Sequence, residues 1–446
     1  MFGFKFLGNT KVPHHKNTAN MPPVAMPPPA EVLLPLSQHI GANAELLVAV
    51  GDEVQVGQKI AEAVGSVSSP VHASVSGKVI KIEDYLCANG KKVSAVRIAS
   101  DGCMTPYEGM TAPVVEDLDG FIAAARESGL VGLGGAGFPA AVKLAALKEG
   151  KIDTIIFNGS ECEPYITCDT RTMLDRSEDI FKGVTVLKKL APTVKRFIFG
   201  IEVNKPECIE EMARIFGDDE KVYVQPLPAK YPQGSEKVII YNCTRRVVPE
   251  GKFPADVGVL VINVTSLAVL AEYLTTGKPL VERVVTVDGS AVKEPKNVTV
   301  PLGTSVEDLI EFAGGLKETA GKVIVGGPMM GTAIWTLAEP VTKTTGAITV
   351  LNRKDSAECE PTACIHCGRC VSACPMGLNP TAFSKALAVD NKEDRIARLE
   401  DSKILLCMEC GCCSYVCPAN RPLVQNNKLA KTELREYKAH QATLKD

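Results

Sequence analysis

Two runs of cysteines in the C-terminal part of the sequence have a spacing that suits iron and sulfide. The first run contains Cys364, Cys367, Cys370 and Cys374 and is followed by Pro375. The second run repeats the pattern with Cys407, Cys410, Cys413 and Cys417, followed by Pro418. The spacing C-x2-C-x2-C-x3-C-P is typical of chains that bind [4Fe-4S] clusters. The sequence therefore predicts two such clusters.

The fourth cysteine of each run is expected to ligate the cluster of the other run, as in two-cluster proteins with this spacing. One cluster is then held by Cys364, Cys367, Cys370 and Cys417. The other is held by Cys374, Cys407, Cys410 and Cys413. Zinc is the alternative, since paired C-x2-C units also form tetrahedral zinc sites, but zinc needs neither the third cysteine nor the x3-C-P ending. Cys359 and Cys412 lie outside the pattern and are expected to be free thiols.

A glycine-rich loop at residues 132–137 could bind phosphate. The loop satisfies G-x-G-x-x-G. In a Rossmann dinucleotide-binding fold a full strand precedes this motif, but here a predicted helix does, so the motif is not a Rossmann fingerprint. The loop opens instead onto a predicted helix at residues 139–148. Free amides at the start of that helix, with Lys143 one turn further on, favour an anion.

A second group of polar residues follows the apolar run at residues 152–157. It consists of Asn158, Ser160, Glu161 and Glu163. Polar groups at the carboxyl end of a buried strand lie where α/β folds bind ligands. For the two glutamates a solvated turn is the alternative, because loops are commonly polar.

The elements that must position these residues divide into several domains, as 446 residues exceed what one core usually covers. Strand–helix alternation around the two polar groups predicts an α/β layer. We therefore predict a multidomain α/β chain with these segments: an extended arm (1–30), a barrel-sandwich hybrid domain (31–105), an α/β domain (106–282), a β-grasp domain (283–350), a helical two-cluster ferredoxin module (351–430) and a charged tail (431–446).

The arm is proline-rich after a polar start, which favours an extended polyproline conformation. Its residues 14–16, which include Lys16, are expected to be exposed. The next segment alternates short strands with glycines and resembles the biotinyl/lipoyl-like barrel. Its hairpin at residues 64–69 lacks a carrier lysine, so a swinging-arm role is not expected.

The β-grasp prediction rests on the order of strand, turn, strand and helix. Asp288-Gly289 is predicted to be the hairpin turn. Thr304 and Glu307 are predicted to form a capping box before the helix. Residues 326–331 are predicted to be a tight turn between strands.

The composition excludes several classes of protein. The net charge of −3 argues against a general nucleic-acid binder, which needs a basic excess. Sixteen cysteines, half of them in the two runs, indicate a reducing cytoplasm. No signal peptide is expected, and the longest apolar stretch, residues 257–274, falls short of the roughly 20 apolar residues that a membrane span needs. Any membrane attachment is therefore expected to be through partners.

Taken together, these segments resemble the C subunits of the Rnf complex, a membrane-bound, ion-translocating ferredoxin:NAD oxidoreductase, over nearly the whole chain. Residues 132–143, 158–164, 234–236 and 263–268 are also similar to the FMN- and NADH-binding subunit of respiratory complex I. The resemblance implies that FMN is contacted by Gly132, Gly134, Gly135, Lys143, Asn158, Ser160, Tyr231, Gly234 and Asn263. It implies that NADH is contacted by Phe138, Glu163 and Glu236. Leu133, Ser160 and Ile262 depart from the complex I pattern.

The resemblance implies an enzyme subunit that passes electrons between NAD(H), FMN and two [4Fe-4S] clusters. Its expected partners are other Rnf-type membrane subunits and a ferredoxin-like subunit, with no nucleic acid. Its expected place is the cytoplasmic face of the cell membrane, as a peripheral subunit without a transmembrane segment. One alternative is a cobalamin reductase, which has the same modules. Another is an electron-carrier or scaffold subunit without nucleotide chemistry.

Overall fold

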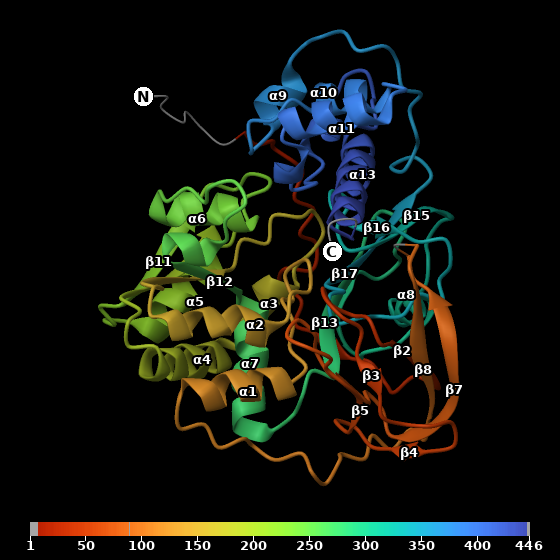
Figure 1. Cartoon of the computed structure of the whole chain (residues 1–446). Coiled ribbons are helices and arrows are strands. Elements are labelled where there is room, and N and C mark those ends of the chain that lie inside the picture. The colour runs from red at the N-terminus through yellow and green to blue at the C-terminus, as the bar shows by residue number, and fades with distance from the viewer. Residues whose placement is uncertain (1–7, 89, 444–446) are drawn as a thin grey trace.

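The structure is a computed structural model that describes residues 8–88 and 90–443. Figure 1 shows the α/β domain on the left, the barrel at the lower right, the β-grasp domain on the right and the cluster module at the top. The N-terminal arm, in red, runs down between the α/β and β-grasp domains. The arm thus lies inside the assembly of domains.

The barrel domain consists of two small sheets with the strand orders β2-β8-β7-β4 and β3-β5-β6. Their bounds are β2 Glu31–Pro35, β3 Glu45–Leu46, β4 Glu53–Val54, β5 Lys59–Glu62, β6 Val71–His72, β7 Gly77–Leu86 and β8 Lys92–Ser100. Apolar side chains such as Leu34, Ile60 and Ile98 are fully buried in its core. The predicted barrel-sandwich fold is confirmed.

The α/β domain is built on a parallel sheet with the order β11-β10-β9-β12. The strands are β9 Thr154–Asn158, β10 Arg196–Glu202, β11 Val222–Leu227 and β12 Val259–Asn263. Its helices are α1 Leu118–Glu127, α2 Ala140–Ala145, η1 Ala146–Glu149, α3 Cys168–Asp175, α4 Ser177–Leu190, α5 Pro206–Phe216, α6 Glu236–Thr244, η2 Pro254–Val257 and α7 Val264–Thr276. Asn158 and Asn263 end the two neighbouring strands β9 and β12 in register. The carboxyl ends of these strands therefore bring two predicted site residues together.

The β-grasp domain has one sheet with the order β1-β14-β13-β17-β15-β16. Its elements are β13 Glu282–Asp288, β14 Lys296–Pro301, α8 Val306–Phe312, β15 Ala320–Val325, β16 Thr332–Ala333 and β17 Ala347–Asn352. The arm adds the short strand β1, Val24–Ala25, in parallel beside β14. A segment from the start of the chain thus completes a sheet formed near residue 300.

Two local predictions in this domain are wrong. β13 and β14 do pair as antiparallel neighbours, but residues 289–295 connect them, so Asp288-Gly289 is not a two-residue turn. The cap of α8 is Ser305, whose hydroxyl accepts a hydrogen bond from the Asp308 N–H at 3.0 Å, because the Thr304 hydroxyl donates instead to the Pro301 carbonyl. The predicted turn at residues 326–331 does connect β15 and β16.

The cluster module is helical, as predicted. Its helices are α9 Arg369–Ala373, α10 Pro380–Leu387, α11 Lys392–Asp401, η3 Ile404–Leu406, α12 Cys412–Tyr415 and α13 Leu423–Thr443. Phe383, Leu399 and Leu434 are buried where α10, α11 and α13 pack together. The last helix begins before the predicted charged tail, because Leu423 packs with Cys370 and Cys413 and Ala430 is buried in this core.

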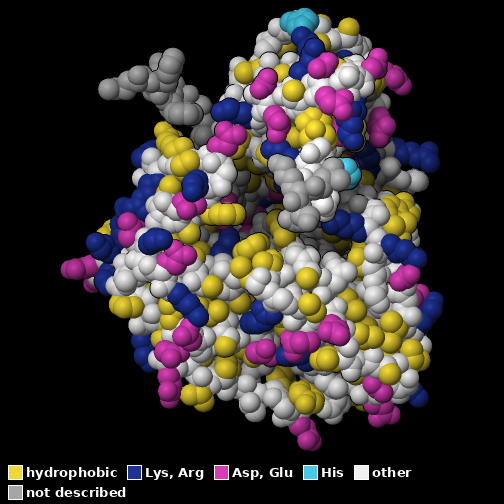
Figure 2. All heavy atoms as spheres, in the orientation of Figure 1, with side chains coloured by type: hydrophobic (Ala, Val, Ile, Leu, Met, Phe, Trp, Pro, Cys, Tyr) yellow, Lys and Arg dark blue, Asp and Glu magenta, His cyan; other side chains and the backbone are white. Residues whose placement is uncertain are grey.

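The surface agrees with a protein of small net charge. Figure 2 shows hydrophobic, basic and acidic side chains interspersed over the face in view. Within the described residues, no helix combines the length and the apolar character that crossing a bilayer requires.

Candidate functional site

The glycine loop closes on itself ahead of α2. The Gly132 N–H donates to the Phe138 carbonyl at 2.8 Å, and the Leu133 N–H donates to the Ser266 hydroxyl at 3.0 Å. Gly134 and Gly135 are exposed. A Cβ added to Gly134 would lie 2.7 Å from the Asn263 amide nitrogen. The loop therefore needs glycine where it passes the end of β12, and it offers open backbone to a ligand.

The carboxyl ends of β9 and β12 meet this loop. The Asn158 amide donates to the Gly234 carbonyl at 2.8 Å, and the Asn263 amide donates to Asp169 at 2.8 Å. The structure thus brings Gly134, Asn158, Gly234 and Asn263 to one place, although they lie far apart in the sequence.

Lys143 and Glu236 form the open edge of the site. The Lys143 ammonium donates to Glu236 Oε1 at 2.8 Å and to the Val261 carbonyl at 3.1 Å. Their side chains are 32% and 42% exposed. A reachable ammonium beside bare glycine backbone fits a flat ring system that carries a phosphate, as FMN does.

Ser160 and Tyr231 lie behind this edge. The Ser160 hydroxyl donates to the Gly200 carbonyl at 3.0 Å and is buried. Tyr231 is buried, and its backbone exchanges two hydrogen bonds with Thr10 of the arm. In this structure these two residues hold the loops of the site, and their contact with FMN stays a prediction.

Glu163 lies at the junction with the β-grasp domain. Its carboxylate accepts hydrogen bonds from the Met329 N–H at 3.1 Å and from the Tyr231 hydroxyl at 3.4 Å. Burial raises the pKa of Glu163 to about 7. A solvated turn is therefore the wrong description of this carboxylate. Phe138, the third predicted NADH contact, is half-buried beside the glycine loop, and all three NADH contacts stay predictions.

Asp169 joins the site without having been predicted. Its carboxylate accepts from the Asn263 amide and, at 2.6 Å, from the Thr265 hydroxyl. Its own N–H donates to Glu161 Oε1 at 2.7 Å. Burial, with the Glu161 carboxylate next, raises the pKa of Asp169 to about 6. An acidic residue in the first turn of α3 was the available sequence signal.

The eight cysteines of the two runs line two cavities. The first, of about 130 Å³, is lined by Cys364, Cys367, Cys370 and Cys417. The second is lined by Cys374, Cys407, Cys410 and Cys413, with Cys412 beside them. Each cavity combines three cysteines of one run with the fourth of the other, which fits the crossed ligand sets predicted from the spacing. Over residues 8–88 and 90–443, no group of three or more His, Cys, Asp or Glu side chains is placed to hold a single metal ion.

The second cavity faces the α/β domain. Cys410 and Cys412 pack in one apolar cluster with Cys162 and Tyr231. The Ser235 hydroxyl lies 3.2 Å from the Met408 sulfur. Cys412, expected to be a free thiol, is fully buried in this contact. Cys367 of the first cavity is exposed, so the two cavities differ in their distance from solvent.

Four domain families match consecutive parts of the chain. These are the RnfC barrel sandwich hybrid domain at residues 4–103, the Nuo51 FMN-binding domain at 125–272, the SLBB domain at 284–333 and the 4Fe-4S dicluster domain at 360–421. The predicted fold class is confirmed. FMN and [4Fe-4S] clusters are confirmed as cofactors through the domains that bind them.

Related proteins match nearly the whole chain. The C subunit of the proton-translocating ferredoxin:NAD(+) oxidoreductase complex of Clostridium ljungdahlii is 44% identical over 83% of this chain and 81% of its own length. The C subunit of the Na(+)-translocating complex of Acetobacterium woodii is 40% identical over 96% and 97%, respectively. The C subunit of the ion-translocating oxidoreductase complex of Rhodobacter capsulatus is 38% identical over 98% and 85%.

A solved structure shares the fold over part of the chain. A chain of an NAD+-reducing [NiFe]-hydrogenase in the air-oxidised state aligns with a TM-score of 0.50 and 21% identity, over 71% of this chain and 63% of that one. The sequence relatives extend much further along the chain. The protein therefore belongs to the family of C subunits of ion-translocating ferredoxin:NAD+ oxidoreductase complexes.

Proposed function

We propose that this chain is the NADH-facing subunit of such a complex and that it passes electrons between NAD(H), FMN and two [4Fe-4S] clusters. One observation carries the proposal: Tyr231 contacts both the flavin-domain loop and the second cysteine cavity. The proposed nucleotide site and the second cysteine cavity therefore adjoin one shared apolar cluster.

The proposed FMN contacts differ in the chemical groups that they offer. Gly132, Gly134 and Gly135 leave the backbone open to FMN, and Lys143 offers its ammonium to the phosphate. Asn158, Ser160, Tyr231, Gly234 and Asn263 are the remaining proposed FMN contacts. FMN held by these residues would supply the chemistry of accepting a hydride from NADH and releasing single electrons.

Three further residues are the proposed NADH contacts. Phe138 offers an aromatic face to a ring, and Glu163 and Glu236 offer carboxylates to hydroxyl or amide groups. Glu236 lies at the open edge beside Lys143. The nucleotide would therefore enter over that edge.

The two cysteine sets have different positions along the path. Cys374, Cys407, Cys410 and Cys413 would hold the inner cluster, whose loop packs on the α/β domain. Cys364, Cys367, Cys370 and Cys417 would hold the outer cluster, beside which Cys367 and the 66% exposed Ile365 face solvent. The inner cluster would exchange electrons with the flavin and the outer cluster with a partner protein.

The proposed partners are the other Rnf-type membrane subunits and a ferredoxin-like subunit, at the cytoplasmic face of the membrane. The names of the relatives favour this assembly over a cobalamin reductase. A carrier or scaffold without nucleotide chemistry is disfavoured because the open glycine backbone, Lys143 and Glu236 lie together.

The test is an anaerobic NADH titration of the complete chain after reconstitution with FMN, iron and sulfide. Flavin absorbance and the EPR signals of the clusters are followed together. We expect NADH to bleach the flavin and to reduce at least the cluster of higher potential, while dithionite, as the control, reduces both clusters.

Two outcomes would overturn the proposal. A chain that binds no FMN, or whose flavin does not respond to NADH while dithionite reduces the clusters, would be an electron carrier alone. A reduced chain that passes electrons to cobalamin but not to ferredoxin would be a cobalamin reductase.

A further inference from the structure

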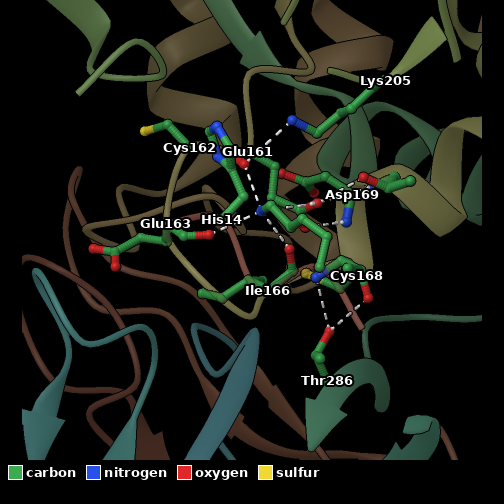
Figure 3. A network of polar contacts seen from close by, with 12 residues as sticks. His14, Glu161, Cys162, Glu163, Ile166, Cys168, Asp169, Lys205 and Thr286 are labelled. Carbon is green, nitrogen blue, oxygen red and sulfur yellow. Dashed lines mark hydrogen bonds and ion pairs between the residues drawn. The ribbon is translucent and has the colours of Figure 1, made fainter. Parts of the chain in front are cut away.

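A lysine of the N-terminal arm is buried beside the flavin-domain loop. The Lys16 ammonium donates to the carbonyls of Glu161, Glu163 and Ile166 at 2.7, 2.8 and 2.6 Å. Only 14% of its side chain is exposed. Figure 3 shows how these three residues lie around the hydrogen bonds. The expectation of an exposed Lys16 is therefore wrong, because its partners lie some 150 positions further along the chain.

The three acceptors match the three N–H donors of an ammonium. The Glu161 carboxylate lies 4.0 Å from the Lys16 nitrogen and adds a negative charge. A second buried lysine, Lys205, donates to Glu202 at 2.8 Å and to the Glu161 carbonyl at 3.3 Å. Lys205 thus has a carboxylate of its own and one long bond to this backbone, whereas Lys16 binds three of its carbonyls.

Hydrogen bonds connect this lysine to the glycine loop. The Asp169 N–H donates to the Glu161 carboxylate, and the Asp169 carboxylate accepts from Asn263. The Asn263 side-chain oxygen accepts from the Ser266 N–H at 3.1 Å. The Ser266 hydroxyl accepts from Leu133 of the glycine loop. One continuous polar network therefore runs from the arm to the backbone that faces the proposed FMN.

The arm is fixed on both sides of Lys16. Thr10 pairs with Tyr231 through two backbone hydrogen bonds of 2.9 and 3.0 Å. Thr18 shares a hydrogen bond of 2.5 Å with Thr167. His14 accepts a hydrogen bond from the Tyr165 N–H through its carbonyl. These contacts hold the ammonium in one place relative to the loop.

We propose that Lys16 is a positioning residue of the flavin site and that the arm, residues 8–25, acts as a strap that fixes the geometry of that site. The inference rests on the proposed FMN site. Loss of the ammonium would take the donor from the Glu163 and Ile166 carbonyls and leave the Glu161 carbonyl with only the 3.3 Å bond from Lys205. Carbonyls left without a donor are costly, so residues 161–166 would rearrange. That rearrangement would pass through Asp169 and Asn263 to the glycine loop.

The experiment replaces the ammonium and then returns it from solution. Lys16→Ala removes the side chain beyond Cβ, and n-propylammonium has the length and the three donors of the missing part. We expect Lys16→Ala to weaken FMN binding by about 10- to 100-fold, as for the loss of hydrogen bonds to a charged group. n-Propylammonium should restore the binding, and tetramethylammonium, which has no N–H donor, should not.

Three variants provide the controls. Lys16→Met fills the space with an apolar chain, so its FMN binding should be weak and should not respond to n-propylammonium. Lys11→Ala changes an exposed lysine of the same arm and should bind FMN like the wild type. If Lys16→Ala does not fold, Lys16→Arg takes its place: it keeps the charge but spreads its donors in a plane, and it should bind FMN more weakly.

The outcomes separate the two proposals. Wild-type FMN affinity in a folded Lys16 variant, or equal effects of both amines, overturns the role of Lys16. Failure of the wild-type chain itself to bind FMN overturns the proposed function instead. The flavin midpoint potential is measured alongside, since a displaced glycine loop changes the hydrogen bonds to FMN and a purely global loss of stability does not.

Discussion

Lys143 and Glu236 are the most accessible charges of the proposed site. Their hydrogen bond of 2.8 Å joins the residue predicted for the FMN phosphate to a residue predicted for NADH. Since exposed ion pairs contribute little stability, this pair would open to a phosphate at low cost. Its value would lie in holding the Lys143 ammonium at the edge of the site.

The first residue-scale prediction concerns that ammonium. Lys143→Met should weaken FMN binding by about 10- to 100-fold, because a charge-assisted hydrogen bond to phosphate is lost. The matched control is Lys148→Met, which changes a half-exposed lysine of the adjoining η1 and should leave FMN binding unchanged. Flavin fluorescence titration gives both dissociation constants. Equal affinities for the two variants would remove Lys143 from the site.

The role of a site residue was predictable where its partners follow a local sequence pattern. The cysteine sets follow from a local spacing, and the cavities combine the same residues. Lys16 was not predictable, because its acceptors lie far along the chain. Asp169 was missed for a similar reason, since its partner Asn263 is 94 positions away. Local patterns carry no information on such pairs.

At the scale of elements, the two cysteine loops are interlocked. Cys374 ends the first run but lines the cavity of the second, and Cys417 does the reverse. Each of the short helices α9 and α12 is therefore followed closely by a cysteine that belongs to the other cluster's set. The two loops must fold together.

The crossed sets predict which cysteine variants behave alike. Cys374→Ala and Cys407→Ala should both lose the inner cluster, and Cys370→Ala and Cys417→Ala should both lose the outer one. EPR of the dithionite-reduced chains should therefore show one spectrum for each pair. Uncrossed ligation would instead give Cys374→Ala the spectrum of Cys370→Ala.

The same variants test the order of electron transfer. In Cys407→Ala, NADH should not reduce the remaining outer cluster within the time that the wild type needs, while dithionite should. In Cys370→Ala, NADH should still reach the inner cluster. Reduction of the outer cluster in Cys407→Ala at the wild-type rate would contradict the proposed order.

Elements with strong periodicity were predictable, and their boundaries were less so. The strand β9 appears at the apolar run of residues 152–157, and the helices α10 and α11 lie in the module that was predicted to be helical. The β13–β14 connection was not predictable from Asp288-Gly289, because packing against β17 extends the strand through Asp288. Ser305, and not Thr304, caps α8, because the Thr304 hydroxyl donates a hydrogen bond to the Pro301 carbonyl. Tertiary contacts decide such details.

At the scale of the molecule, one lysine joins three domains. Lys343 of the β-grasp domain donates to the Ser69 hydroxyl at 3.1 Å and the Pro70 carbonyl at 2.5 Å in the barrel, and to the Gly129 carbonyl at 2.7 Å in the α/β domain. Gly129 stands just before the glycine loop. Burial lowers the pKa of Lys343 to about 7, from a usual value of 10.5.

The lowered pKa of Lys343 predicts that the stability of the fold depends on pH. Between about pH 7 and pH 10 burial favours loss of a proton from Lys343 in the folded chain, while the unfolded chain keeps the charge. The unfolded state then binds more protons, so the free energy of unfolding rises with pH across this window, by up to about 5 kcal/mol. The midpoint of thermal unfolding should therefore rise with pH more in the wild type than in Lys343→Met. Lys317→Met, at an exposed position of the same domain, should follow the wild type, and parallel curves for Lys343→Met would contradict the assignment.

The arm has a consequence for the order in which the protein matures. Residues 8–25 leave the ribosome before every segment that they contact: the Glu161 loop, Tyr231, β14 and finally Cys374, against whose carbonyl Gly8 packs. Contacts of such long sequence separation form late in folding. The contact of Gly8 with Cys374 therefore forms only after the first cysteine run has been synthesised, so the strap reaches its full extent on the protein in the last stage of biogenesis.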